Sequence, residues 1–390
     1  MIRQVEKYLD KMQRDRIGKP GGMALVASDD TVIGQGNDAL QSLGSSLLER
    51  LDLTAVALVE PTFPFTDYLV VATPTAETRI TPRDTETRTF LHDIPILRSS
   101  QLSGEPADRI AELLGQRKGV LVEGVGIIAA GSITVEQAYI NASSLFHSLL
   151  VMYLLDLLTR TNIPEQELQQ LDDFRRNWLK PLVSPETLLP GQDLNDPTTI
   201  LQEMSRVGRI TVELGLVDSF FGNISCRFDN TLYISQTAAS LDELEGCIDP
   251  VPFDNSSTCG ITASSELLAH RLIYEQTGAR TLLHGHPRFA VIMSMLCDTP
   301  DCPIDDCWRD CPHTRLLGNA PVVAGEVGAG GLARRVAPII GDSGKAVVYG
   351  HGIFAIGRDG FDDALNAMIE TEEWCRREYF RRLDMKISNR

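Results

Sequence analysis

Three histidines in the second half of the chain have the residue type and spacing of a metal site. His284 and His286 alternate in the run Thr281-Leu282-Leu283-His284-Gly285-His286-Pro287, and His351 stands between two glycines where a second apolar run ends. In an extended strand alternate side chains point to the same face, so the first two histidines project together. Three converging imidazoles are the ligand set of a catalytic zinc with an open fourth position. The sequence therefore predicts a metal centre at these residues.

The bulk composition narrows the class of protein that holds this centre. The chain has 390 residues, 43% of them hydrophobic, and a formal net charge of −17, which argues against nucleic acid or an anionic membrane as a partner. The first twenty residues contain no apolar signal segment, and residues 145–158 are too short an apolar run to cross a bilayer. All eight cysteines follow residue 220 without the spacing of a disulfide scaffold. We therefore expect a cytoplasmic protein with reduced thiols.

Helices and strands alternate along both halves of the chain. Apolar periodicity predicts helices at residues 2–16, 45–51, 106–114, 135–158, 164–179, 198–214, 264–277, 333–340 and 361–382. Short apolar runs predict strands at residues 23–27, 55–59, 68–72, 120–122, 127–130, 222–228, 232–235, 281–283, 346–349 and 353–356. The pattern indicates an α/β protein in which the histidines lie on or just after strands.

The two halves are related by a single offset of 226 residues. This offset carries Val125 to His351 and places the glycines at 124 and 126 on those at 350 and 352. It also brings Pro61 onto Pro287, so that Leu58 and Glu60 occupy the positions of His284 and His286. A repeat of this length indicates two copies of one domain. Because the first copy has lost all three histidines, we expect the same fold there without metal chemistry.

The predicted domains follow from this repeat. Residues 1–160 form the degenerate copy and residues 198–390 form the metal-binding copy. The Pro-, Gly- and Asp-rich stretch before residue 198, together with the polar helix that leads into it, forms a helical linker at residues 161–197.

Four motifs in the second copy resemble the class II aldolase/adducin family. They are Gly222-Asn223-Ile224-Ser225, Ser264-Ser265-Glu266, His284-Gly285-His286-Pro287 and His351-Gly352, in this order across residues 198–382. The resemblance implies two tandem three-layer αβα domains, each with a central mixed or antiparallel sheet flanked by helices. It also implies that His284, His286 and His351 hold Zn²⁺ or another divalent metal, with Glu266 as the acid/base residue.

The resemblance further implies a substrate site beside the metal. Sugar-phosphate aldolases of the family bind the substrate phosphate at the positions of Asn223, Ser225, Ser264 and Ser265, with a further phosphate-binding turn at Thr237. The family usually has glycine where this chain has Ala238. Neutral imidazoles leave zinc enough charge to polarise a carbonyl and hold an enediolate, while a carboxylate moves the proton.

The expected function is a divalent-metal lyase of the class II aldolase type, acting on a small hydroxy-carbonyl or sugar-phosphate-like substrate through a metal-stabilised enediolate. The family's sugar-phosphate aldolases carry a tyrosine proton donor after the histidine strand, and this chain has no tyrosine between Pro287 and Val348. A dehydratase, decarboxylase or epimerase on the same site therefore stays an alternative. A non-catalytic scaffold of the adducin kind is the alternative from another class, and retention of the site in one copy argues against it.

A cysteine-rich stretch occupies the place of the missing tyrosine. The spacing of its four thiols does not match a paired CxxC zinc site, so we favour a loop of reduced thiols over a second metal at Cys297, Cys302, Cys307 and Cys311. Family members form tetramers with active sites near subunit contacts. The resemblance therefore implies a homo-oligomer, most simply a dimer of two-domain chains.

Overall fold

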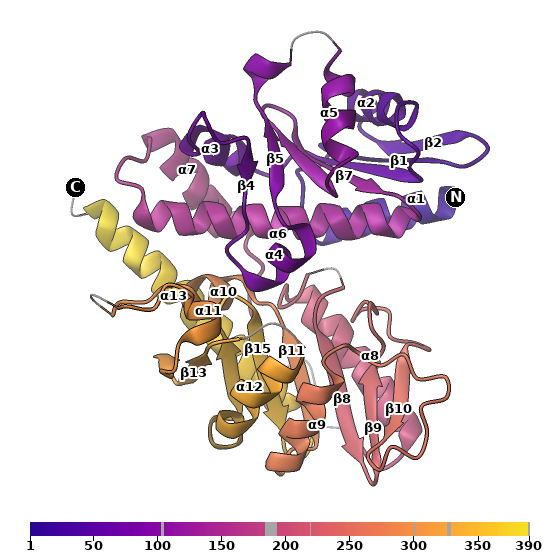
Figure 1. Cartoon of the computed structure of the whole chain (residues 1–390), viewed down its shortest axis with the longest axis vertical. Coiled ribbons are helices and arrows are strands. Elements are labelled where there is room, and N and C mark those ends of the chain that lie inside the picture. The colour runs from indigo at the N-terminus through magenta and orange to yellow at the C-terminus, as the bar shows by residue number, and fades with distance from the viewer. Residues whose placement is uncertain (103–104, 184–192, 219, 300–301, 326–328, 389–390) are drawn as a thin grey trace. The chain divides into compact units, whose positions relative to one another are not determined.

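The chain folds into two compact units, Met1–Leu179 and Lys180–Arg390. The computed structural model (Figure 1) describes residues 1–102, 105–183, 193–218, 220–299, 302–325 and 329–388. The division after Leu179 falls inside the stretch 161–197 that the sequence indicated as a linker. Residues 184–192 of that stretch lie outside the described residues.

The first unit is built on a seven-stranded sheet of order β2-β1-β3-β7-β6-β5-β4. Its strands are β1 (Met23–Ser28), β2 (Val32–Gly36), β3 (Ala55–Val59), β4 (Arg79–Ile80), β5 (Ile94–Leu97), β6 (Gly119–Val122) and β7 (Gly126–Gly131). Its helices are α1 (Ile2–Arg14), α2 (Asp38–Leu48), α3 (Phe65–Ala72), α4 (Thr85–Leu91), α5 (Pro106–Leu114), α6 (Val135–Thr159) and α7 (Glu165–Asp173), with a 3₁₀ turn over Ser99–Gln101 and a π-helical turn over Phe174–Trp178.

Helices cover both faces of this sheet. Helices α2 and α5 pack against one face of the sheet, and the contact forms a single apolar core that contains Val26, Leu58 and Ile110. Helix α6 packs on β3 and β7, with α1 and α3 beside it (Figure 1). By length and composition alone α6 could cross a membrane, but 78% of its most apolar window is buried inside the unit. It is therefore a buried core helix of this unit.

The sequence prediction was wrong at residues 68–72, which form the end of helix α3 and not a strand. The run is apolar and β-branched, which suggested a strand. In the fold, Phe65 and Leu69 are buried at helical spacing, while Val71 is 76% exposed. One-sided burial with a period of four residues is typical of a surface helix.

The second unit repeats this architecture with one added strand, in the order β10-β9-β8-β11-β15-β14-β13-β12. Its strands are β8 (Asn223–Phe228), β9 (Thr231–Ser235), β10 (Ile248–Pro252), β11 (Thr281–Gly285), β12 (Arg315–Leu317), β13 (Ala320–Val323), β14 (Lys345–Val348) and β15 (Gly352–Gly357). Its helices are α8 (Pro197–Glu213), α9 (Leu267–Gln276), α10 (Arg288–Ser294), α11 (Cys307–Asp310), α12 (Ala329–Ser343) and α13 (Asp362–Ser388).

The three-layer arrangement is the same in this unit. Helices α9 and α12 share an apolar core with one face of the sheet, and α8 and α13 contact strands β8, β11 and β15 (Figure 1). In each sheet the described strands include one parallel pair, β5 with β6 and β13 with β14, among antiparallel neighbours. The predicted fold, two tandem αβα domains with mixed sheets, is confirmed.

The registers of the four central strands, β3, β7, β6 and β5 in the first unit and β11, β15, β14 and β13 in the second, agree residue by residue at the offset of 226. Ala55 pairs with Gly131 in the first unit, and Thr281 pairs with Gly357 in the second. The parallel pairs follow the same rule, with Ile96 opposite Leu121 and Val322 opposite Val347. The sequence repeat is therefore a repeat of backbone structure.

Candidate metal centre

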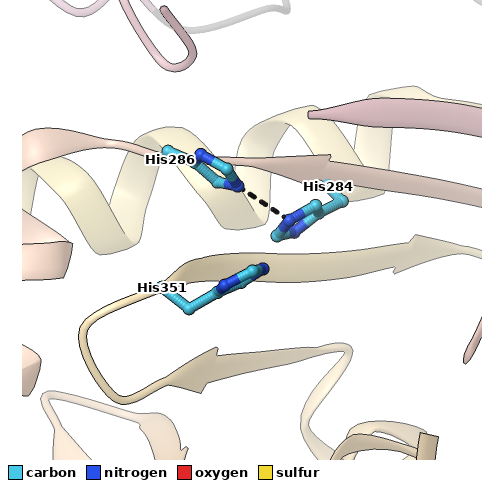
Figure 2. Close-up of side chains that lie close together, drawn as sticks. All are labelled: His284, His286 and His351. Carbon is cyan, nitrogen blue, oxygen red and sulfur yellow. Dashed lines mark hydrogen bonds between the residues drawn. The ribbon is translucent and has the colours of Figure 1, made fainter. Parts of the chain in front are cut away.

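His284, His286 and His351 come together at one end of two neighbouring strands. His284 lies in β11, His286 directly follows it, and His351 lies in the turn between β14 and β15 (Figure 2). The three side chains are buried, and their ligand atoms all lie within 4.8 Å of one another. Within the described part of the chain, this is the one group of three or more His, Cys, Asp or Glu side chains found to converge closely enough to hold a metal ion.

Glycines allow the turn that carries His351 to approach strand β11. Gly350 adopts a left-handed backbone conformation, with φ at +60°, and its N–H donates to Ser294 Oγ at 2.8 Å. A Cβ on Gly352 would lie 2.3 Å from the carbonyl oxygen of Gly285 and 2.6 Å from Cδ2 of His286. Any larger residue at position 352 would push the third histidine away from the other two.

The tautomer of His284 is fixed by its backbone partner. Its Nδ1 lies 2.9 Å from the carbonyl oxygen of Ile353, and because a carbonyl only accepts, Nδ1 carries the proton. The lone pair of Nε2 then points at His286 Nε2, 2.9 Å away (Figure 2). Three buried imidazoles whose ligand atoms face one point, one of them with its tautomer fixed by a backbone carbonyl, form a donor set that fits a divalent metal.

Burial keeps the imidazole of His284 neutral. Loss of hydration is the main cause, and it lowers the pKa of His284 to about 4 although the charge of Glu266 opposes the shift. The neutral form is the one that coordinates a metal, so this side chain can accept an ion at neutral pH without first losing a proton.

Glu266 lies beside the triad, at the N-cap of helix α9. Its Oε1 is 3.3 Å from His351 Nε2 and its Oε2 is 3.5 Å from His284 Nε2, while its side chain is 13% exposed. Burial alone would raise the pKa of this carboxyl group. The two histidines and a hydrogen bond from Asn223 outweigh that effect and hold the pKa of Glu266 well below its ordinary value. The carboxylate is therefore available as a base next to the triad.

Behind Glu266 lies a buried polar cluster, two of whose members sequence reasoning missed. Asn223 donates from Nδ2 to Glu266 Oε2 at 2.8 Å, and His270 contacts Asn223 and Ser225. Tyr274 lies 2.9 Å from Ser225 Oγ. Burial lowers the pKa of His270 to about 3. The spacing of Glu266, His270 and Tyr274 by four residues was the available signal, because residues four apart lie on one face of a helix.

The predicted substrate-binding residues fall into an exposed group and a buried group. Thr237 and Ser265 are exposed, and their segments are joined because Thr237 N donates to Thr262 O at 2.8 Å and Ser264 N to Ser235 O at 3.0 Å. Ser225 is fully buried, with its hydroxyl against His270 and Tyr274. The structure therefore brings the turn at Thr237, called the threonine turn below, next to Ser264 and Ser265. It places Ser225 in the core.

The threonine turn contains a backbone conformation that favours glycine. Ala238 has φ at +58°, in the left-handed region where a Cβ is sterically unfavourable. The chain therefore keeps this turn at an energetic cost.

The cysteine-rich stretch surrounds a cavity of about 410 Å³. Its lining includes Cys297, Cys302, Cys307, Cys311 and Tyr349. All four cysteines are free thiols, and they do not belong to the convergent group of metal-binding side chains among the described residues. A loop of reduced thiols stays the favoured interpretation.

The equivalent positions of the first unit carry other chemistry. Leu58 is fully buried in the apolar core, Glu60 forms an ion pair with Lys19, and Val125 packs against the same core as Leu58. The turn itself is retained, because Val125 N donates to Val122 O at 3.1 Å as His351 N does to Val348 O, and Gly124 has positive φ as Gly350 does. This unit therefore has the backbone of the site without its metal ligands.

Comparison with known proteins agrees with this description. The model of the family described as Class II Aldolase and Adducin N-terminal domain matches residues 54–153 and 202–379, which together are well over half of the chain. L-fuculose-1-phosphate aldolase from Thermus thermophilus is 25% identical with a TM-score of 0.40, covering 48% of this chain and 97% of that chain. A sugar-phosphate aldolase from Thermotoga maritima is 14% identical with a TM-score of 0.35, covering 46% of this chain and 94% of that chain. No curated protein sequence matches the chain.

Proposed function

This chain belongs to the class II aldolase and adducin family, and from that premise we propose that its second unit is a divalent-metal lyase acting on a small hydroxy-carbonyl compound. The observation that carries the proposal is the convergence of three buried histidines beside one carboxylate, in one unit only. A scaffold protein would have no reason to keep this set in one copy and lose it in the other.

The residues of the site divide the chemical work between them. His284, His286 and His351 would hold the metal, with Zn²⁺ as the first candidate. When bound, the ion would supply a Lewis acid that polarises a carbonyl or hydroxyl oxygen. Glu266 takes a proton from the substrate carbon or returns it, because its anionic form lies beside the triad and is held there by Asn223.

The exposed polar segments suggest what the substrate carries at its other end. Thr237 and Ser265 offer hydroxyl groups on two hydrogen-bonded segments near Glu266. We propose that these segments bind a phosphate or a sugar hydroxyl of the substrate. Asn223 and Ser225 then support the site from behind.

A second reaction class is favoured by one observation. The chain has no tyrosine between Pro287 and Val348 to serve as the proton donor of a sugar-phosphate aldolase. Epimerisation, dehydration and decarboxylation need the same metal and base. We propose them as the alternative outcome of the same proton abstraction.

Metal analysis of the purified chain tests the proposal. We expect about one divalent ion per chain, lost in His351→Ala because two imidazoles alone bind weakly. His313→Ala is the matched control, because His313 is an exposed histidine outside the triad. A wild-type chain without stoichiometric metal after growth and purification with added zinc, manganese or cobalt would contradict the enzyme proposal.

The assembly is a separate proposal. We propose that the chain forms an even-numbered homo-oligomer, most simply a dimer. A molar mass from light scattering that equals one chain of 42.9 kDa across the micromolar range would refute it.

A further inference from the structure

A line of buried hydrogen bonds leads from Glu266 into the core of the second unit. Asn223 lies between Glu266 and His270. Its Nδ2 is 2.8 Å from Glu266 Oε2, and its Oδ1 is in close contact with His270 Nε2. On the other side of the imidazole ring, His270 Nδ1 lies 2.7 Å from Ser225 Oγ. Tyr274 Oη lies 2.9 Å from the same Oγ and 3.0 Å from the backbone oxygen of Ser225.

Two elements hold this line in place. Glu266, His270 and Tyr274 are spaced by four residues on α9, so they lie on one helix face. Asn223 and Ser225 are alternate residues of β8, so they lie on one strand face. The line therefore runs along the contact between a helix and a strand, where backbone geometry sets its length.

The chemistry of the groups fixes the direction of the bonds nearest Glu266. A carboxylate only accepts, so Asn223 must present its NH₂ group to Glu266 and its carbonyl to His270. His270 must then carry a proton on Nε2, and the neutral ring accepts at Nδ1 from the Ser225 hydroxyl. The single hydroxyl proton of Tyr274 is directed at Ser225, where the hydroxyl and the backbone oxygen are both within reach.

The line ends in the core and not in solvent. Ser225 and His270 are fully buried, and Tyr274 is 1% exposed. Its last hydroxyl group finds its acceptors on Ser225. Because the far end has no exchange with water, the line orients groups and does not conduct protons.

The first unit supplies an internal comparison. Asn223 pairs with His284 in the sheet, and Ala24 pairs with Leu58 at the corresponding place. Ser225 pairs with Leu282, and Val26 pairs with Val56. The copy that has lost the triad has thus also lost the polar line, and an apolar core has taken its place. Fold alone does not require the line.

We propose that His270, kept neutral with its proton on Nε2, is the positioning residue for the proposed base. The Asn223 carbonyl accepts a hydrogen bond from His270 Nε2–H and so points away from Glu266. Only the NH₂ group of Asn223 then faces the carboxylate. Without His270 the amide can rotate by half a turn and set its oxygen against the carboxylate. The inference rests on the proposed role of Glu266 as base.

Histidine NMR tests the tautomer without any substrate. The ¹⁵N shifts of ¹⁵N-histidine-labelled protein, with His270 assigned by its absence in His270→Gln, should show Nε2 protonated and Nδ1 unprotonated at pH 7, with and without Zn²⁺. The Nδ1-protonated tautomer, or an imidazolium, would overturn the proposal. This result does not depend on whether the enzyme assignment is right.

Kinetics then tests the catalytic consequence. The assay is solvent deuterium incorporation into glycolaldehyde, dihydroxyacetone or dihydroxyacetone phosphate by the metal-loaded chain. His270→Leu should lower kcat by about 10- to 100-fold, as loss of a supporting hydrogen bond does in metal sites, with KM and metal content within about twofold. His270→Gln can still donate to Asn223 and should recover most of kcat.

The contrary outcomes separate two kinds of failure. If His270→Gln is as impaired as His270→Leu, or if both lose metal and raise KM together, the residue is structural and the proposal is wrong. Ser225→Ala is a milder change and should lower kcat by a smaller factor. An unchanged kcat would show that the hydrogen bond from Ser225 to His270 does not help to position the base. No exchange with any probe in the wild type would refute the proposed function and leave the NMR result standing.

Discussion

The two units share the backbone of their central strands and differ in the side chains at the positions of the histidine triad. Strands β3 and β7 join Ala55 to Gly131, and β11 and β15 join Thr281 to Gly357, the same pairing 226 residues later. On that common frame, one unit has Leu58 and Val125 where the other has His284 and His351. The comparison teaches that strand register and turn geometry are maintained by buried apolar residues and glycines. Metal chemistry is an addition that the fold can lose without losing its architecture.

The largest effect should come from giving the second unit the residues of the first. The double substitution His284→Leu with His351→Val should reduce metal content from about one ion per chain to none, because one imidazole cannot retain it. The circular dichroism spectrum should stay that of the wild type. Glu60→Ala in the first unit is the control and should leave metal content unchanged. Unfolding of the double variant would show that the frame depends on the histidines after all.

Substituting Glu266 alone should separate loss of the base from loss of the metal. Glu266→Gln should keep the metal and lower deuterium exchange into substrate by about 10²- to 10⁴-fold, the usual contribution of a general base. Glu60→Gln, the same change at a carboxylate of the degenerate unit, should have no effect on either measurement. Exchange within a few-fold of the wild type in Glu266→Gln would assign the base elsewhere.

Acid should destabilise the second unit of the metal-free chain through its buried histidine. The pKa of His270 is about 3 in the fold, and a histidine in an unfolded chain has a pKa of about 6.5. The unfolded state therefore takes up the proton first, and stability falls as the pH drops below about 6.5 toward the folded pKa. Hydrogen exchange of peptides from β8 and α9 should report this loss.

The control for this acid effect is His270→Gln, which cannot titrate. Its β8 and α9 peptides should lose less protection between pH 7.5 and pH 5 than those of the wild type, while peptides of the first unit should be unaffected by the substitution. An equal loss in both proteins would assign the acid sensitivity to other groups.

The smallest effect concerns the strained turn. In the first unit strand β2 ends at Gly36, a glycine with positive φ. In the second unit the residue with positive φ after β9 is an alanine, Ala238. Ala238→Gly removes a left-handed alanine at the cost of a more flexible unfolded chain, for a net gain of about 0.5 to 1 kcal/mol in the free energy of unfolding. Ala239→Gly, at a neighbouring position without that strain, should lower stability in the same urea titration.

Much of the fold could be predicted from the sequence because its signals are local or repeated. Strands such as Ala55–Val59 are short apolar runs between turns, and the repeat fixed which runs correspond. Residues 68–72 failed because a β-branched apolar run fits a strand as well as a buried helix face. The decision came from Phe65 and Leu69 packing at helical spacing, which depends on tertiary contacts.

The candidate site was partly predictable for the same reason. The histidines and Glu266 stand in recognisable motifs, and the structure brings all four together. His270 and Tyr274 stand in no such motif, and their significance comes from hydrogen bonds across the contact between α9 and β8. The sequence also does not separate Ser225, which is buried, from Ser265, which is exposed.

The retained turn at Gly124 and Gly126 has a practical consequence for enzymology. A count of active centres based on this glycine pair would give two for each polypeptide, although only one of the two turns, the one that holds His351, carries a member of the histidine triad. Turnover numbers should accordingly be normalised to one centre per 42.9 kDa chain. A rate divided by the number of folded domains would understate the turnover number by half, and titration with a tight metal chelator would reveal the discrepancy.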